Sequence, residues 1–108
     1  MALAAADFIE PAGELAPALF PGETLTTLVT AWIEDAEARY EDDETAQWNW
    51  VLHRAYTTVA NRIHAGLASE SKGPASASRS DEQFRYWSRK AALHARAALG
   101  ANRYRPVF

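Results

Sequence analysis

Residues 25–36 read Leu-Thr-Thr-Leu-Val-Thr-Ala-Trp-Ile-Glu-Asp-Ala, and this stretch decides the fold. Its apolar residues recur at i, i+3, i+4, i+7, i+8 and i+11, which is the spacing of one face of an α-helix. These residues are Leu25, Leu28, Val29, Trp32, Ile33 and Ala36. The spacing predicts a first long helix from Glu23 to about Asp42, with this stripe facing a core.

A second amphipathic helix is predicted directly after the first one. From roughly Glu44 to Leu67 the apolar residues again form a stripe, over a length of about 35 Å at about 1.5 Å per residue. The stripe consists of Trp48, Leu52, Ala55, Tyr56, Val59, Ile63 and Leu67.

A third helix is predicted from its start and stop signals. Ser80 is a suitable N-cap, and Gln83 can reach back to complete a capping box. The helix is expected to run to about Leu99 and to stop at Gly100. Residues 69–80, which are rich in Ser and Ala, are predicted to form a loop that is longer than a minimal helix–helix connection.

The two ends of the chain are predicted to form arms. Residues 1–22 hold three prolines and two glycines, which leave room only for a short helical turn. Apolar side chains on this arm can drape it over the core, namely Phe8, Ile9, Leu15, Leu19 and Phe20. Residues 100–108 form the C-terminal tail. No segment alternates like a strand, so the predicted fold class is all-α, a small bundle of three main helices with extended N- and C-terminal arms.

The composition indicates a single folded domain over residues 1–108. Hydrophobic residues make up 48% of the chain and aromatic residues 11%, which is too apolar for a disordered protein. There is no cysteine, which removes disulfides, thiol catalysis and cysteine-ligated zinc. The first residues lack the basic region of a signal peptide, and no run approaches the ~20 apolar residues that span a bilayer. We expect a soluble protein with no membrane partner.

Charge is divided unequally along the chain. Residues 1–78 carry twelve Asp or Glu and four Lys or Arg, a net charge of −8. Residues 79–108 carry seven Lys or Arg and two Asp or Glu, a net charge of +5. The total of −3 therefore conceals a strongly dipolar molecule. Such a subunit can bind copies of itself head to tail, and this heterologous contact closes into a ring when the rotation between neighbours permits.

No group of residues indicates a catalytic or metal site. The acidic stretch at 41–44 could bind a hard cation, but it lacks the glycine turn and ligand spacing of a calcium loop, so we interpret it as a solvated corner. His53 and His64 lie ~16 Å apart along a helix, too far to share a zinc ion. There is no Gly-rich phosphate loop, nucleophile elbow or His-Glu-x-x-His motif. We expect a protein that is not an enzyme and has no cofactor.

Two features of the helical region are candidate interaction sites. Arg85, Arg89 and Arg96 share one face of the third helix, which is either a phosphate-binding surface or a solvated, subunit-facing one. The acidic pI of 5.5 favours the second interpretation. Trp50 points ~160° away from the stripe residues Trp48 and Leu52. It is therefore either half buried by the arms or part of an interface.

The C-terminal tail is the third candidate interaction site. It combines Arg103, Tyr104, Arg105 and Phe108, and Tyr and Arg are residue types that anchor interfaces. The alternative is a frayed chain end. If the tail is ordered, we expect it to dock on another subunit or a partner, with the binding energy concentrated in Tyr104 and Phe108.

A family resemblance adds to this picture. A proline-broken N-terminal segment, then Leu-Phe-Pro-Gly-Glu at residues 19–23 and the stripe that begins at Leu25, resembles the head-to-tail adaptor proteins of tailed bacteriophages. These are also called head-completion or connector proteins. The likeness covers roughly residues 15–99 and rests on size, helix order and a Leu/Trp/Ala pattern.

The resemblance implies a virion protein of the phage neck, assembled in the host cytoplasm. Its helical subunits form a homo-oligomeric ring, commonly of about twelve copies, beneath the portal protein and above a tail or stopper protein. Genomic DNA passes through the lumen in non-specific proximity, and the acidic N-terminal part suits such a channel because like charge prevents tight phosphate binding. Residues 1–22, 69–80 and 100–108 are the implied contact segments. The family supplies no catalytic motif.

The alternative is a small regulatory binding module of the antitoxin or transcription-cofactor type. It would use the basic third helix on DNA or on an acidic partner. Binding to duplex DNA that weakens steeply as salt rises would favour it.

Overall fold

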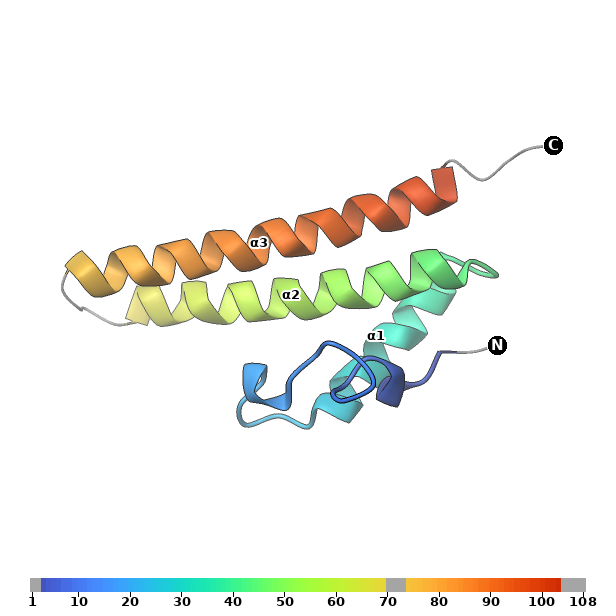
Figure 1. The fold of residues 1–108 in the computed structure, drawn as a ribbon, viewed down its shortest axis with the longest axis horizontal. Helices are drawn as coiled ribbons and strands as arrows, with labels where there is room; N and C mark the ends of the chain where they lie inside the picture. The colour runs from blue at the N-terminus through green and yellow to red at the C-terminus, as the bar shows by residue number, and fades with distance from the viewer. Residues whose placement is uncertain (1–2, 70–73, 104–108) are drawn as a thin grey trace.

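A computed structural model shows three α-helices preceded by a short irregular segment (Figure 1). It describes residues 3–69 and 74–103, with side chains described over 3–63 and 82–99. The helices are α1 (Leu25–Arg39), α2 (Glu44–Ser69) and α3 (Pro74–Arg103). Two single 3-10 turns, η1 (Ala5–Asp7) and η2 (Pro17–Leu19), precede them. The described part of the chain contains no strand, only an isolated bridge between Ile9 and Leu15. The all-α class is confirmed.

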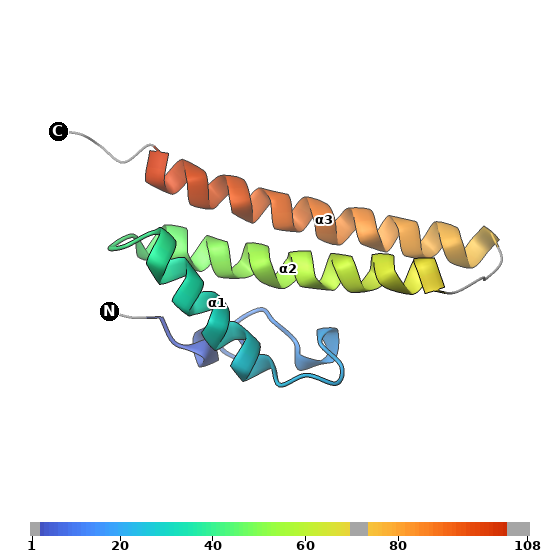
Figure 2. The ribbon, with the colours of Figure 1, turned by 180° about the vertical axis from the view of Figure 1, so that it is seen from behind.

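The helices form layers, with α2 in the middle. α3 runs antiparallel to α2 along its whole length, and α1 lies on the other side of α2 together with the N-terminal segment (Figures 1 and 2). The two long helices extend beyond α1 at the end where they are joined. The molecule is therefore elongated, with extents of 57 × 28 × 22 Å.

The core consists of the apolar stripes that the periodicity indicates. Burial of these side chains removes apolar area from water, which is the main force holding the layers together. The buried stripe residues of the first two helices are Leu25, Val29, Trp32, Ile33, Ala36, Leu52, Ala55, Tyr56 and Val59. Leu28, Trp48 and Ile63 are partly buried against them.

The corner between α1 and α2 shows why both helices end where they do. α1 ends at Arg39, and the following Tyr40 donates its N–H to Ala36 O. The buried Gln47 side chain donates to Tyr40 O at 2.8 Å, which satisfies a carbonyl at the end of α1. Asp43 Oδ1 accepts from Ala46 N at 3.1 Å and so caps the start of α2. The structure makes α1 shorter at both ends than the predicted range from Glu23 to Asp42.

The N-terminal segment packs as part of the core. Phe8, Leu15 and Phe20 are at most 1% exposed, and the ring of Phe8 stacks on Trp48 with centroids 4.1 Å apart. Leu15 N donates to Phe8 O at 2.9 Å, and Glu10 N donates to Leu15 O at 3.0 Å, which folds the segment back on itself. The Glu10–Pro11 peptide bond in this loop is cis. The expectation that five apolar residues of this segment cover the core is confirmed.

The predicted boundaries of the third helix are wrong. α3 begins at Pro74, so residues 74–80 of the predicted loop are helical and Ser80 is not the N-cap of a capping box, while residues 70–73 lie outside the described part of the chain. Proline is favoured at the first helical position, where it lacks only an N–H that would have no helical partner. The helix also continues through Gly100 to Arg103, since an interior glycine costs only about 1 kcal/mol relative to alanine. α2 ends at Ser69, two residues beyond the predicted Leu67.

Candidate interaction surface

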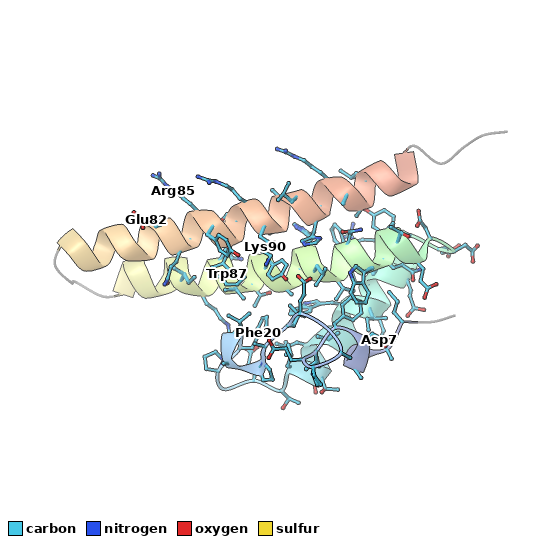
Figure 3. All side chains as sticks on the ribbon, viewed as in Figure 1. Asp7, Phe20, Glu82, Arg85, Trp87 and Lys90 are labelled. Atoms are coloured by element: carbon cyan, nitrogen blue, oxygen red, sulfur yellow. The ribbon has the colours of Figure 1, made fainter. Side chains whose placement is uncertain are left out.

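The outer face of α3 carries three of the predicted interface residues. Ala91 and Ala98 are buried against the rest of the molecule, whereas Arg85, Arg89 and Arg96 are exposed. Arg85 points away from α2 in Figure 3, while Trp87 and Lys90 lie on the side of α3 that faces α2. The helical spacing of the three arginines therefore does predict one shared, exposed face.

Large apolar side chains lie beside these arginines. Tyr86 is 55% exposed and Leu93 is 62% exposed, and Leu93 lies one helical turn from both Arg89 and Arg96. Leu99 is 60% exposed but lies ~120° around the helix from Leu93. Arg89 and Arg96 have no ion-pair partner among the described side chains. We call the set of Arg85, Tyr86, Arg89, Leu93 and Arg96 the α3 outer face.

Acidic side chains gather on the other side of the molecule. Residues 1–43, which lie before α2 in the chain, contain ten Asp or Glu and a single Arg. On α1 and the following corner, Glu34, Glu37 and Glu41 are exposed and have no ion-pair partner among the described side chains. Because α2 lies between α1 and α3 (Figures 1 and 2), the charge split along the chain becomes a split between two layers.

Trp50 is held within the chain by the corner of α1. Its Nε1 donates to Asp35 Oδ2 at 2.7 Å, and the Arg39 guanidinium lies 4.4 Å from the indole centroid. Tyr40 makes an edge contact with the same indole, with centroids 6.1 Å apart. The hydrogen bond from Trp50, helped by Arg39, lowers the pKa of Asp35 despite its partial burial. Trp50 is half buried by α1 rather than by an arm, and its role in binding another subunit stays a prediction.

A polar cluster between α2 and α3 was not predicted. Asn49 Nδ2 donates to Thr45 O at 3.0 Å, which turns Asn49 Oδ1 toward His94. His94 Nδ1 therefore carries the proton that it donates to Asn49 Oδ1 at 2.9 Å. His53 Nδ1 likewise donates to Ala91 O at 3.0 Å. His53 and His94 therefore hydrogen-bond across the interface between α2 and α3. Because their partners are 38 and 45 residues away in the chain, only the structure reveals these contacts.

Tyr56 and Lys90 extend this cluster toward the N-terminal segment. The Tyr56 hydroxyl donates to Glu14 Oε1, and Lys90 Nζ lies 4.8 Å from the Tyr56 ring centroid and 5.6 Å from the Trp87 ring. Burial lowers the pKa of His94, and the charges of Lys90 and His53 add to this effect while that of Glu14 opposes it. The arrangement satisfies polar atoms between the helices and holds α2, α3 and the N-terminal segment in register.

The described residues form an open groove but no metal or membrane-spanning site. Within the described residues, no three His, Cys, Asp or Glu side chains are placed to hold a metal ion, and no helix is long and apolar enough to cross a membrane. An open groove of about 420 Å³ lies between the η2 region and the two long helices. Leu19, Val59 and Trp87 contribute to it, and Arg62 at its edge is paired with Glu23 at 2.6 Å.

Part of the predicted C-terminal site falls beyond the described residues. Arg103 is the last residue of α3, and the predicted anchors Tyr104, Arg105 and Phe108 lie outside the described part of the chain. The acidic corner at 41–44 is only partly solvated, because Asp43 caps α2.

Comparison with protein-family models, with curated proteins and with solved structures found no match to this chain.

Proposed function

We propose that this chain is a structural subunit that assembles head to tail into an adaptor ring, of the kind that joins the portal and the tail of tailed bacteriophages. The observation that carries the proposal is the placement of Arg89 and Arg96 on α3 and of Glu34 and Glu37 on α1, in different layers of one molecule. Among the described side chains these four residues have no ion-pair partner. Different surfaces that attract one another form a heterologous contact, which generates rings or filaments.

Two further features support the proposal. Apolar side chains are exposed beside the arginines of α3, and large apolar residues next to arginine are typical of protein interfaces. The N-terminal segment carries exposed acidic residues, including Asp7 and Glu10, outside α1. These residues suit the wall of a DNA channel, because their charge repels phosphate.

Native mass spectrometry of the purified chain tests the proposal. We expect a discrete oligomer at low ionic strength that dissociates as salt rises from about 50 to about 500 mM, since salt screens charges that are exposed before contact. Negative-stain electron microscopy of the same sample should show closed rings. A monomer at every concentration and salt would contradict self-assembly.

The rival function, a binding module for DNA or an acidic partner, predicts a different result. The exposure of Arg89 and Arg96 is the observation that favours it. A monomer that binds duplex DNA with an affinity falling steeply with salt would support this function in place of the ring.

A further inference from the structure

We propose that the α3 outer face of one copy packs against the exposed face of α1 in the next copy. This inference rests on the proposed self-assembly and assigns the two surfaces that make it. Leu93 lies at the centre of the contact, and Arg89 and Arg96 face Glu34 and Glu37 of the neighbour.

The α3 side has the composition of an interface centre. Leu93 is 62% exposed, and arginines stand one helical turn before and after it. Arginine stems cover apolar surface while their guanidinium groups reach carboxylates, so such residues often anchor interfaces. Tyr86, seven residues before Leu93, extends the apolar area along the same face.

The α1 side offers a complementary surface. Its exposed face carries small residues at one-turn spacing around an acidic one, Ala31, Glu34 and Ala38, with Glu37 beside them. The short alanine side chains leave room for a leucine of another helix, so the axes of the two helices can lie at the usual distance of about 8–10 Å. The carboxylates then stand where the flanking arginines reach.

The spacing of charges fits a contact between two helices. Arg89 and Arg96 are seven residues apart, about 10 Å along α3. Glu34 and Glu37 lie one helical turn apart on α1, and the long arginine stems can reach both of them. A small crossing angle of about 20° keeps two helices in contact over such a length. Two α3 outer faces brought together would instead oppose arginine with arginine, which disfavours a symmetric dimer.

Charge reversal on each surface provides the main test. One variant carries R89E/R96E and the other carries E34R/E37R. By sedimentation velocity, each variant alone should associate at least about 100-fold more weakly than the wild type, because its two contact surfaces then carry like charge. An equimolar mixture should regain assembly, since every α3-to-α1 contact between the two variants again joins opposite charges.

Matched controls separate this contact from a general effect of charge. R54E and E10R reverse exposed residues outside the two surfaces and should assemble like the wild type. L93S should weaken association about tenfold or more, whereas L99S, which removes an equally exposed leucine ~120° around α3, should not. Circular dichroism verifies that every variant keeps its helices.

The outcomes distinguish this inference from the proposed function. If the wild type assembles and each reversed variant also assembles alone, or the mixture regains nothing, the ring uses other surfaces and the inference is overturned while the proposed function stands. If the wild type is monomeric under all conditions, both are overturned. If R89E/R96E abolishes binding of duplex DNA to a monomer, the α3 outer face serves nucleic acid instead.

Discussion

His94 shows how a single residue couples the packing of α2 and α3 to pH. Its Nδ1 donates to Asn49, and burial lowers its pKa from the ordinary value of 6.5. The unfolded chain therefore binds a proton more readily than the folded chain does. The free energy of unfolding should fall as the pH drops below about 6.5, and the loss should stop once the folded state is protonated too.

This pH dependence can be assigned by substitution. Urea unfolding at pH 5.5 and at pH 7.5 should show a smaller pH effect in H94Q than in the wild type, because glutamine keeps a donor and does not titrate. The difference should be at most about 1.4 kcal/mol for each unit by which the pKa is lowered. An unchanged pH effect in H94Q would assign it to other groups.

Trp50 contributes through a hydrogen bond to a charged group. W50F removes the donor to Asp35 while keeping an aromatic ring against Tyr40. We expect the free energy of unfolding to fall by about 1.5–3 kcal/mol, the range for hydrogen bonds to charged partners. The part of this loss that depends on the charge of Asp35 should be full above about pH 3.8 and should shrink as the pH falls through the lowered folded-state pKa of Asp35.

A double-mutant cycle supplies the control for Trp50. If the bond is formed in solution, W50F and D35A together should cost about 1 kcal/mol less than the sum of the single changes. Additive losses would show that the two side chains act separately.

For single residues, the sequence predicted which face of a helix a side chain lies on better than it predicted which residue that side chain contacts. Helical spacing correctly placed Trp50 off the apolar stripe of α2 and the three arginines on one face of α3. It did not predict that Trp50 meets Asp35, fifteen residues earlier, or that His94 meets Asn49, because those pairs depend on how two helices are set against each other.

Among the elements, the N-terminal segment is the one whose packing depends most visibly on glycine. A Cβ on Gly13 would clash with the backbone of Phe8, which is fully buried on Trp48. Gly22 has a positive φ of 81° but open space around it. Gly13 is therefore needed because the backbone of Phe8 lies close to it, whereas Gly22 is needed for its positive φ.

Alanine substitutions should separate these roles. G13A should lower the free energy of unfolding by about 2–4 kcal/mol, because the loop must shift a buried aromatic residue. G22A should cost about 1–2 kcal/mol, the strain of a left-handed residue. Chemical denaturation of both variants measures the difference, and a G13A protein as stable as G22A would show that the close approach is not formed.

The elements also show where sequence signals are insufficient. Periodicity identified α1 and α2 and their buried faces, since an amphipathic stripe is a local property. The capping signals at Ser80 misplaced the start of α3, because a helix can also begin at Pro74, where proline is favoured at the first position. Gly100 likewise did not end the helix.

For the whole molecule, we predict that the C-terminal tail is needed for assembly but not for folding. Deleting residues 102–108 should abolish oligomer formation and leave the helical fold intact, since the buried side chains that the structure describes all precede Gly100. Size-exclusion chromatography with light scattering measures the first effect, and far-ultraviolet circular dichroism measures the second. Loss of helicity on deletion, or full assembly without the tail, would contradict it.

The sequence by itself determined the all-α class, the buried stripes of the first two helices, the shared face of the α3 arginines and the imbalance of charge along the chain. Each of these follows from local spacing or from composition, which need no knowledge of distant contacts. Only the tertiary structure decided that α2 separates an acidic layer from a basic one, that Phe8 stacks on Trp48, and that α3 extends from Pro74 to Arg103. These features depend on packing between residues far apart in the chain, whose free energy outweighs local turn and capping signals.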